Sequence, residues 1–176
     1  MAKSFFRVGQ YVYIPECGLG QIVSIADVST GELRLKQVPT AYVKRHNLRQ
    51  ALLHNEVAIP LEQFIDPNDI HLSLQIIIEG GGRRGRRLPS KLKEANKRLR
   101  NCRSLPELAK LIAFLRYLHT KDGFSAEQVL MLKEAANRFL DVTACFLSLP
   151  KTIAAVYINR ELEEENVRPL PFDIME

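Results

Sequence analysis

A cluster of positive charge is the strongest chemical signal in this sequence of 176 residues. Residues 83–103 contain ten Lys and Arg against Glu94 alone, a net charge of +9, whereas the whole chain carries +5. Cations at this density repel one another unless a polyanion neutralises them, and guanidinium groups bind phosphate in a bidentate manner. The pattern predicts a phosphate-binding site, with a solvated helix face as the alternative. The predicted contacts are Arg83, Arg84, Arg86, Arg87, Lys91, Lys93 and Lys97.

The other reactive residue types form no arrangement typical of catalysis. Gly18-Leu19-Gly20 lacks the third glycine of a dinucleotide-binding fingerprint and precedes a predicted strand, so a tight turn is the better interpretation. The four histidines match no zinc pattern, and the three cysteines, which contain no Cys-x-x-Cys pair, are typical of free thiols in a reducing cytoplasm. Without a nucleophile–base pair, we expect no enzymatic activity, cofactor, metal or small-molecule substrate.

The elements that must position the basic cluster begin with a β-rich segment, residues 1–79. Short β-branched or alternating runs, separated by turn residues about every ten positions, favour a small SH3-like sheet. Residues 40–56 fit no strand and suggest an insertion or a short helix. The predicted strands are 8–14, 21–25, 33–38, 57–60 and 70–78.

A basic linker, residues 80–89, follows this segment, because three consecutive glycines from Gly80 fit poorly inside a helix or strand. Helical periodicity then predicts a helical domain over 90–165. The predicted helices are 90–101, one that begins at Ser104 and ends at Gly123, one that begins at Ser125 and includes Phe146, and 150–164.

Local signals set the ends and faces of these helices. Ser104 and Ser125 each begin a capping box, and Gly123 is expected to end the helix between them. In the last helix, we expect Ile153, Val156 and Tyr157 to face inward. The acidic tail, 166–176, contains two prolines and is expected to fray.

The overall composition is that of a globular protein, with 46% hydrophobic and 26% charged residues. Each apolar run stops well short of the roughly 20 residues that a membrane span needs, and the first residues lack the apolar core of a signal peptide. We therefore expect a cytoplasmic protein without membrane contact.

Two segments resemble a known family. Residues 6–22, F-R-V-G-Q-Y-V-Y-I-P-E-C-G-L-G-Q-I, are similar to the opening F-x-V-G-D-x-V-V-Y-P-x-x-G-x-G-x-I of CarD/CdnL-type bacterial transcription regulators, which the polymerase-binding module of transcription-repair coupling factors shares. Residues 123–136 resemble the family's G-L-S-x-x-E-x-x-M-L-x-x-A segment, and 57–60 its closing V-x-V-P. The resemblance covers about residues 5–147 in the same order.

The resemblance implies an α+β protein with an N-terminal SH3/Tudor-like domain and an all-α helical domain. The first would dock on the β subunit of RNA polymerase, and the second would contact promoter DNA and stabilise the open complex, which implies association with the nucleoid. Val57, Ala58, Ile59 and Pro60 are the implied polymerase contacts.

Three features depart from the family pattern. Pro89 stands where a tryptophan often inserts into DNA, Ala58 stands where an arginine often contacts polymerase, and residues 40–56 form a longer connection. The richer basic cluster at 83–87 is expected to replace part of these contacts. Two alternatives stay open: a general DNA- or RNA-binding protein without polymerase contact, and a protein-interaction adaptor.

Overall fold

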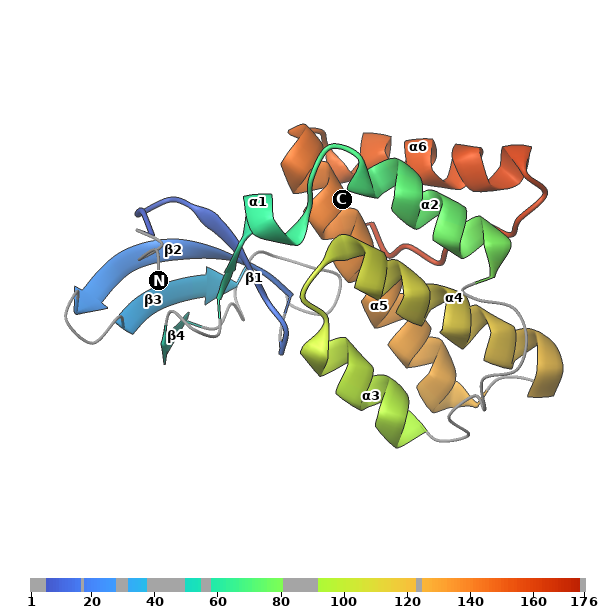
Figure 1. The fold of residues 1–176 in the computed structure, drawn as a ribbon, viewed down its shortest axis with the longest axis horizontal. Helices are drawn as coiled ribbons and strands as arrows, with labels where there is room; N and C mark the ends of the chain where they lie inside the picture. Colours follow the sequence, from blue (N-terminus) through green and yellow to red (C-terminus); the bar gives the residue numbers. More distant parts are fainter. Residues whose placement is uncertain are drawn as a thin grey trace.

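The computed structural model shows a mixed α+β protein in which a small antiparallel sheet lies beside a group of helices (Figure 1). It describes residues 6–16, 18–27, 32–37, 50–54, 58–80, 92–122 and 125–174. The sheet has the order β4-β3-β2-β1-β5, and its paired neighbours run antiparallel. The strands are β1 (Tyr11–Ile14), β2 (Gly18–Asp27), β3 (Glu32–Gln37), β4 (Gln50–His54) and β5 (Ile59–Pro60).

Four of the predicted strands are confirmed as β1, β2, β3 and β5, apart from shifts at their ends. The hairpin turn between β1 and β2 lies at 15–16, and Gly18 to Gly20 already belong to β2. Part of the unassigned connection 40–56 is the strand β4. The remainder, 40–49 and 55–56, lies outside the described residues, as do Val38 and Val57.

The helices are α1 (Leu61–Phe64), α2 (Asp69–Glu79), α3 (Leu92–Asn101), α4 (Leu105–Asp122), α5 (Ala126–Leu147) and α6 (Lys151–Glu164). The last four confirm the predicted helices, whereas Ser90 and Gly123 lie outside the described residues. Ser125 forms the predicted capping box with Gln128. At Ser104 only half of the box forms, because the Glu107 carboxylate accepts a hydrogen bond from the Arg103 amide instead of the Ser104 amide.

The predicted strand 70–78 is wrong, because this segment is the helix α2. Its buried side chains, Ile70, Ser73, Leu74 and Ile77, follow a helical and not an alternating period. Gly80 ends the helix in the left-handed conformation, with φ +77°, and its amide bonds to carbonyls of the last turn. The three consecutive isoleucines resemble a strand, yet α2 packs lengthwise on α4 and buries only one side.

The predicted inward face of α6 is also wrong. Ile153, Val156 and Tyr157 are exposed, and the residues that pack into the core are Ala154, Ala155, Ile158 and Leu162. Small alanine side chains allow close approach between helices, so the face with less apolar bulk is the buried one.

The acidic tail is ordered through residue 174, contrary to the predicted fraying. Leu170 is buried, and its backbone exchanges two hydrogen bonds with the Asn159 side chain, at 2.8 and 3.4 Å. Arg116 of α4 donates to the Arg168 carbonyl, and Asp173 pairs with Lys133 of α5 at 3.8 Å. The tail therefore ties α4, α5 and α6 together.

The main hydrophobic core is shared by the sheet and the helices. Tyr13, Leu19 and Ile59 of the sheet belong to the same cluster as Leu105 of α4 and Phe139 of α5. A second, smaller cluster on the opposite face of β1 contains Phe6, Val12, Ile14, Ile22 and Ala58. The alternation of Val12 and Tyr13 between the two clusters follows from the two-residue period of a strand.

Candidate nucleic-acid interface

The helix α3 separates a buried apolar side from an exposed basic side. Ala95 and Leu99, four residues apart, are 1% and 2% exposed. Lys93, Lys97 and Arg100 follow the spacing i, i+4, i+7 on the opposite side, and all three are exposed. We call these three residues the α3 basic face. Its cations point into solvent while the buried side holds the helix in place, which is the arrangement that a polyanion site requires.

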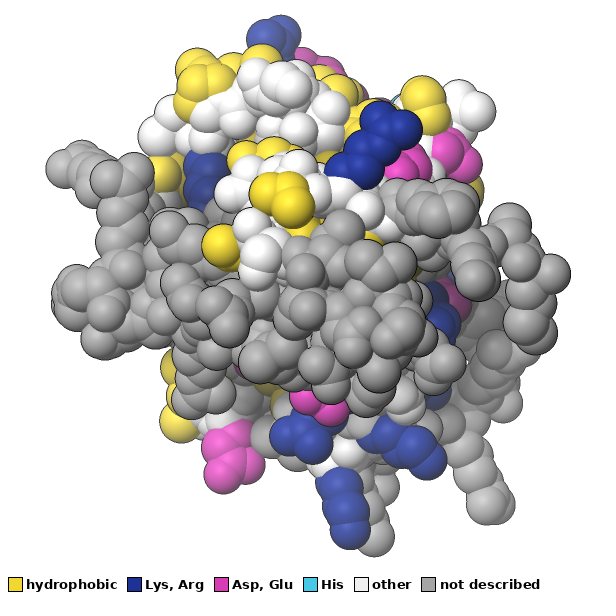
Figure 2. Space-filling model, turned by 90° about the vertical axis from the view of Figure 1, so that its left-hand side faces the viewer, with side chains coloured by type: hydrophobic (Ala, Val, Ile, Leu, Met, Phe, Trp, Pro, Cys, Tyr) yellow, Lys and Arg dark blue, Asp and Glu magenta, His cyan; other side chains and the backbone are white. Residues whose placement is uncertain are grey.

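Two further arginines continue this positive region. The Arg98 guanidinium lies 5.3 Å from the centre of the Phe114 ring on α4, a cation–π contact that helps to fix α3 against α4. Arg103, in the turn between the two helices, also has an exposed side chain. Figure 2 shows Lys and Arg side chains at the lower end of the molecule, the level at which Figure 1 places α3.

The structure places only part of the predicted phosphate site. Lys93 and Lys97 lie together on α3, as expected from their spacing. Arg83, Arg84, Arg86, Arg87 and Lys91 lie outside the described residues, as does Pro89.

The residues implied as polymerase contacts lie at the edge of the sheet. In β5, Pro60 pairs with Val12 and Ile59 pairs with Tyr13. Ala58, Ile59 and Pro60 are buried, so their side chains offer little surface to a partner, and Val57 lies outside the described residues.

The exposed apolar residues of the sheet lie elsewhere. Tyr11 lies on the same face of β1 as Tyr13, two residues away, and Val23 lies at an irregularity of β2 between Ile22 and Ser24. Both side chains are about two-fifths exposed.

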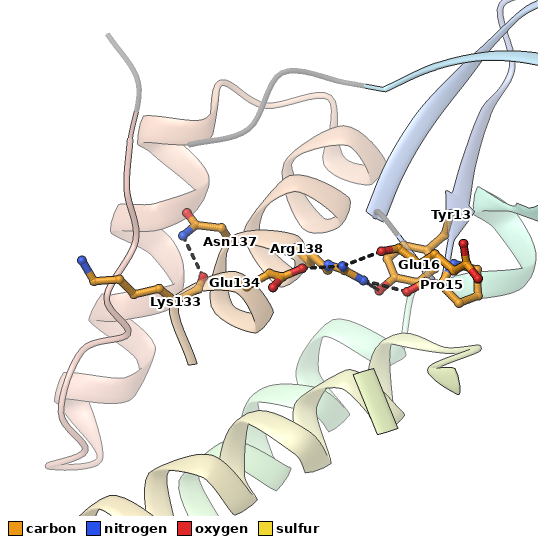
Figure 3. A network of polar contacts seen from close by, with 7 residues as sticks. All are labelled: Tyr13, Pro15, Glu16, Lys133, Glu134, Asn137 and Arg138. Carbon is orange, nitrogen blue, oxygen red and sulfur yellow. Dashed lines mark hydrogen bonds and ion pairs between the residues drawn. The ribbon is translucent and has the colours of Figure 1, made fainter. Parts of the chain in front are cut away.

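A buried arginine joins the sheet to the helices (Figure 3). Arg138 of α5 donates hydrogen bonds to the Pro15 carbonyl at 2.8 Å, the Glu16 carbonyl at 3.1 Å and the Tyr13 hydroxyl at 3.4 Å. Its charge is balanced by Glu134, one helical turn away, at 2.5 Å. The three acceptors surround the turn between β1 and β2, so this arginine fixes the hairpin on α5.

The surroundings of Arg138 explain the electrostatics of the junction. Burial raises the pKa of Tyr13 to about 12, although the nearby Arg138 cation lowers it in part. Burial disfavours the charge on Arg138 and lowers its pKa. The interactions with Tyr13 and Glu134 favour the charged form more strongly, so the pKa of the guanidinium is raised on balance. Tyr13 also stacks on Phe64, with ring centres 3.8 Å apart. Gly18, beside Arg138, has a φ of +95°, a conformation that side-chain-bearing residues rarely adopt.

The two described cysteines are poor nucleophiles. Burial raises the pKa of Cys102 to about 12 and the pKa of Cys145 to about 11, so both thiols are protonated near neutral pH. Cys17 lies outside the described residues.

The sequence analysis did not predict the contact between Arg138 and the β1–β2 hairpin, which we call the Arg138 junction. Arg138 stands between Ala135, Ala136 and Phe139, all of which are core residues. A single arginine among core positions of an amphipathic helix was the available signal, because a buried cation needs partners.

No family model matches this chain, and neither does any curated protein. Among the described residues, no three His, Cys, Asp or Glu side chains come close enough to hold a metal ion. The same part of the chain contains no single helix that could cross a membrane by length and apolarity, although α5 and α6, bent by 112° at their break, pass that test as a pair.

Proposed function

We propose that this protein is a non-enzymatic transcription regulator that binds promoter DNA and the β subunit of RNA polymerase. The observation that carries the proposal is the net charge of +9 over residues 83–103, part of which forms the exposed α3 basic face. The resemblance of residues 6–22 and 123–136 to CarD/CdnL-type regulators supports the transcriptional context and the SH3/Tudor-like character of the sheet.

The proposed DNA contact is to phosphates. Lys93 and Lys97 lie one helical turn apart, about 6 Å along the helix axis, a span that lets both ammonium groups reach the same stretch of backbone. The sequence holds no C2H2 zinc finger and no evident recognition helix. Recognition of DNA shape or of a duplex–single-strand junction therefore fits this surface better than base readout.

The Arg138 junction supports a role that needs two surfaces in a fixed relation. A regulator that stabilises an open complex must hold its polymerase-binding part and its DNA-binding part at one distance. A buried arginine with three acceptors on the hairpin resists rotation of the sheet against α5. On the sheet, the exposed Tyr11 and Val23 are the proposed polymerase-facing residues, since Ile59 and Pro60 are buried.

The DNA contact is tested by fluorescence anisotropy with a fork-junction duplex over a range of salt concentrations. The double variant Lys93→Gln/Lys97→Gln should weaken binding by roughly tenfold and lower the slope of log K against log salt by about 2. The matched control, Arg160→Gln/Arg168→Gln, removes the same charge from α6 and the tail and should leave the slope unchanged. Equal loss in both variants would mean that only net charge matters, and the proposed surface would be wrong.

The polymerase contact is tested by co-elution of the full chain with bacterial RNA polymerase from a sizing column without DNA. Co-elution that Tyr11→Ala/Val23→Ala abolishes would support docking through the sheet. If the wild-type chain did not co-elute with polymerase and bound fork-junction DNA and RNA with equal affinity, the alternative of a general nucleic-acid-binding protein would be favoured. Polymerase binding that persists without any DNA binding would favour the adaptor.

A further inference from the structure

The outer face of α6 is an apolar surface that the described residues leave uncovered. Ile153, Val156 and Tyr157 follow the spacing i, i+3, i+4 and are 54%, 66% and 40% exposed. Leu147, the last residue of α5, and Leu149, in the turn that leads to α6, are also more than one-third exposed. We call these five residues the α6 apolar surface.

Such a group costs free energy in water, because each of these side chains keeps more than one-third of its surface exposed. Single exposed apolar residues are ordinary, whereas several at helical spacing mark a contact surface. The opposite side of α6 is buried, since Ala154, Ala155 and Ile158 pack in the core. The apolar surface is therefore an addition to what α6 needs for folding.

Charge on the same helix indicates what covers this surface. The face continues from Tyr157 to Arg160, Glu163 and Glu164, again at helical spacing. Arg160 pairs with Glu164 at 2.9 Å, and Glu163 and Glu165 add further negative charge at the end of the helix, where its dipole is also negative. Anionic lipid and nucleic acid are repelled by this end, whereas a partner with Lys or Arg is attracted.

We propose that the α6 apolar surface docks an amphipathic helix of a partner protein, whose apolar stripe covers Val156 and its neighbours and whose basic residues meet Glu163 and Glu164. Glu163 lies ten positions after Ile153, which sets these two parts of the partner about 15 Å apart along the axis.

The position of α6 makes this interaction independent of the proposed DNA contact. Figure 1 places α6 at the upper margin of the helical part and α3 at its lower end. A partner on α6 therefore leaves the α3 basic face open, and the proposal stands whether or not the chain binds polymerase or DNA.

The test uses the full chain and a fluorescent, helix-forming 18-residue peptide. Leu occupies positions 1, 4, 5 and 8 of the peptide, and Lys occupies positions 11, 12 and 15. A second peptide has the reverse order, so that both helix orientations are sampled, and a twin of each carries Glu in place of Lys. Fluorescence anisotropy at moderate salt should show micromolar binding of one Lys peptide and binding of its Glu twin at least about tenfold weaker.

Two substitutions locate the binding site. Val156→Asp should weaken the Lys peptide by about tenfold or more, and Leu130→Asp, at an exposed apolar position near the start of α5, should leave it unchanged. Glu163→Lys should weaken the Lys peptide and strengthen its Glu twin, which a purely apolar contact would not produce.

Three results would overturn the proposal. The first is equal binding of the Lys and Glu peptides, and the second is equal loss in Val156→Asp and Leu130→Asp. The third is self-association of the wild-type chain in sedimentation that Val156→Asp abolishes, because a second copy would then occupy the surface.

Discussion

Arg138 is the side chain on which the position of the β1–β2 hairpin depends most directly. It is 6% exposed, and its three hydrogen bonds to the hairpin reach residues more than 120 positions earlier in the chain. Methionine matches the length of its stem but cannot donate, so Arg138→Met leaves the carbonyls of Pro15 and Glu16 without this partner. We expect the free energy of unfolding to fall by about 2–4 kcal/mol, measured by urea denaturation.

A matched variant separates the hydrogen bonds from the ion pair. Glu134 is 41% exposed, and Glu134→Gln removes its charge while the bonds from Arg138 to the hairpin stay in place. Its cost should be about 1–2 kcal/mol, less than that of Arg138→Met: the Arg138 cation is buried, but Glu134 is in contact with solvent, which screens the loss of its charge. A larger loss in Glu134→Gln than in Arg138→Met would show that charge pairing, not the hairpin contact, dominates.

Asp141 gives stability a dependence on pH. Burial raises its pKa from the ordinary 3.8 to about 6, although Lys151, at 2.6 Å, opposes the rise. The folded state therefore holds a proton that the unfolded state has lost between about pH 4 and pH 6, and its contribution to stability falls as the pH rises through that interval. Asp141→Asn should remove this fall. The difference in unfolding free energy between wild type and variant should shift by roughly 2–3 kcal/mol from pH 4 to pH 7. A constant difference would contradict the raised pKa.

At the residue scale, the sequence identifies exposed charges better than buried ones. The spacing of Lys93 and Lys97 was enough to place them together on one helix face, because that relation is local. The role of Arg138 depends on Pro15 and Glu16, and no local pattern connects positions so far apart. The buried Asp141 and its partner Lys151 lie on different helices, and this pair was missed for the same reason.

Element boundaries were predictable where a capping side chain defines them. Ser125 accepts a hydrogen bond from the Gln128 amide at 3.3 Å, and the Gln128 side chain accepts one from the Ser125 amide at 3.2 Å. Both bonds lie within four residues, so tertiary contacts do not decide them. The face of an element was harder to predict: in α6 the larger residues Val156 and Tyr157 lie outside, and the position of the neighbouring helices decides which side is buried.

The capping box of α5 contributes measurable stability. Ser125→Ala removes the hydroxyl acceptor and leaves an amide of the first turn unsatisfied, which should lower the free energy of unfolding by about 1 kcal/mol. Ser125→Asp keeps an acceptor and adds favourable charge at the helix N-terminus, so it should retain wild-type stability or exceed it slightly. Thermal unfolding followed by circular dichroism checks both, and an unstable Ser125→Asp variant would argue against the cap.

At the scale of the whole molecule, the described core joins parts that composition alone separates. The break in composition after Gly80 suggests independent halves, yet α2 lies before it and packs on α4 after it. Tyr13 of β1 and Leu162 of α6 belong to one hydrophobic cluster. The tail adds a further tie through Leu170. Such long-range contacts arise from the shape of the assembled surfaces, which periodicity does not encode.

A shared core predicts that the sheet and the helices unfold together. Leu162 is fully buried in α6, and Leu162→Ala should cost about 2–5 kcal/mol. If the molecule unfolds cooperatively, Leu162→Ala lowers the protection of the slowest-exchanging amides of β1 as much as that of the slowest-exchanging amides of α5. This holds although β1 belongs to the sheet and Leu162 to the helical part. The exposed Val156→Ala should change protection in both places by less than about 0.5 kcal/mol. If Leu162→Ala weakened α5 alone and left β1 protected, the sheet would be a separate folding unit and the Arg138 contacts would join two independent domains.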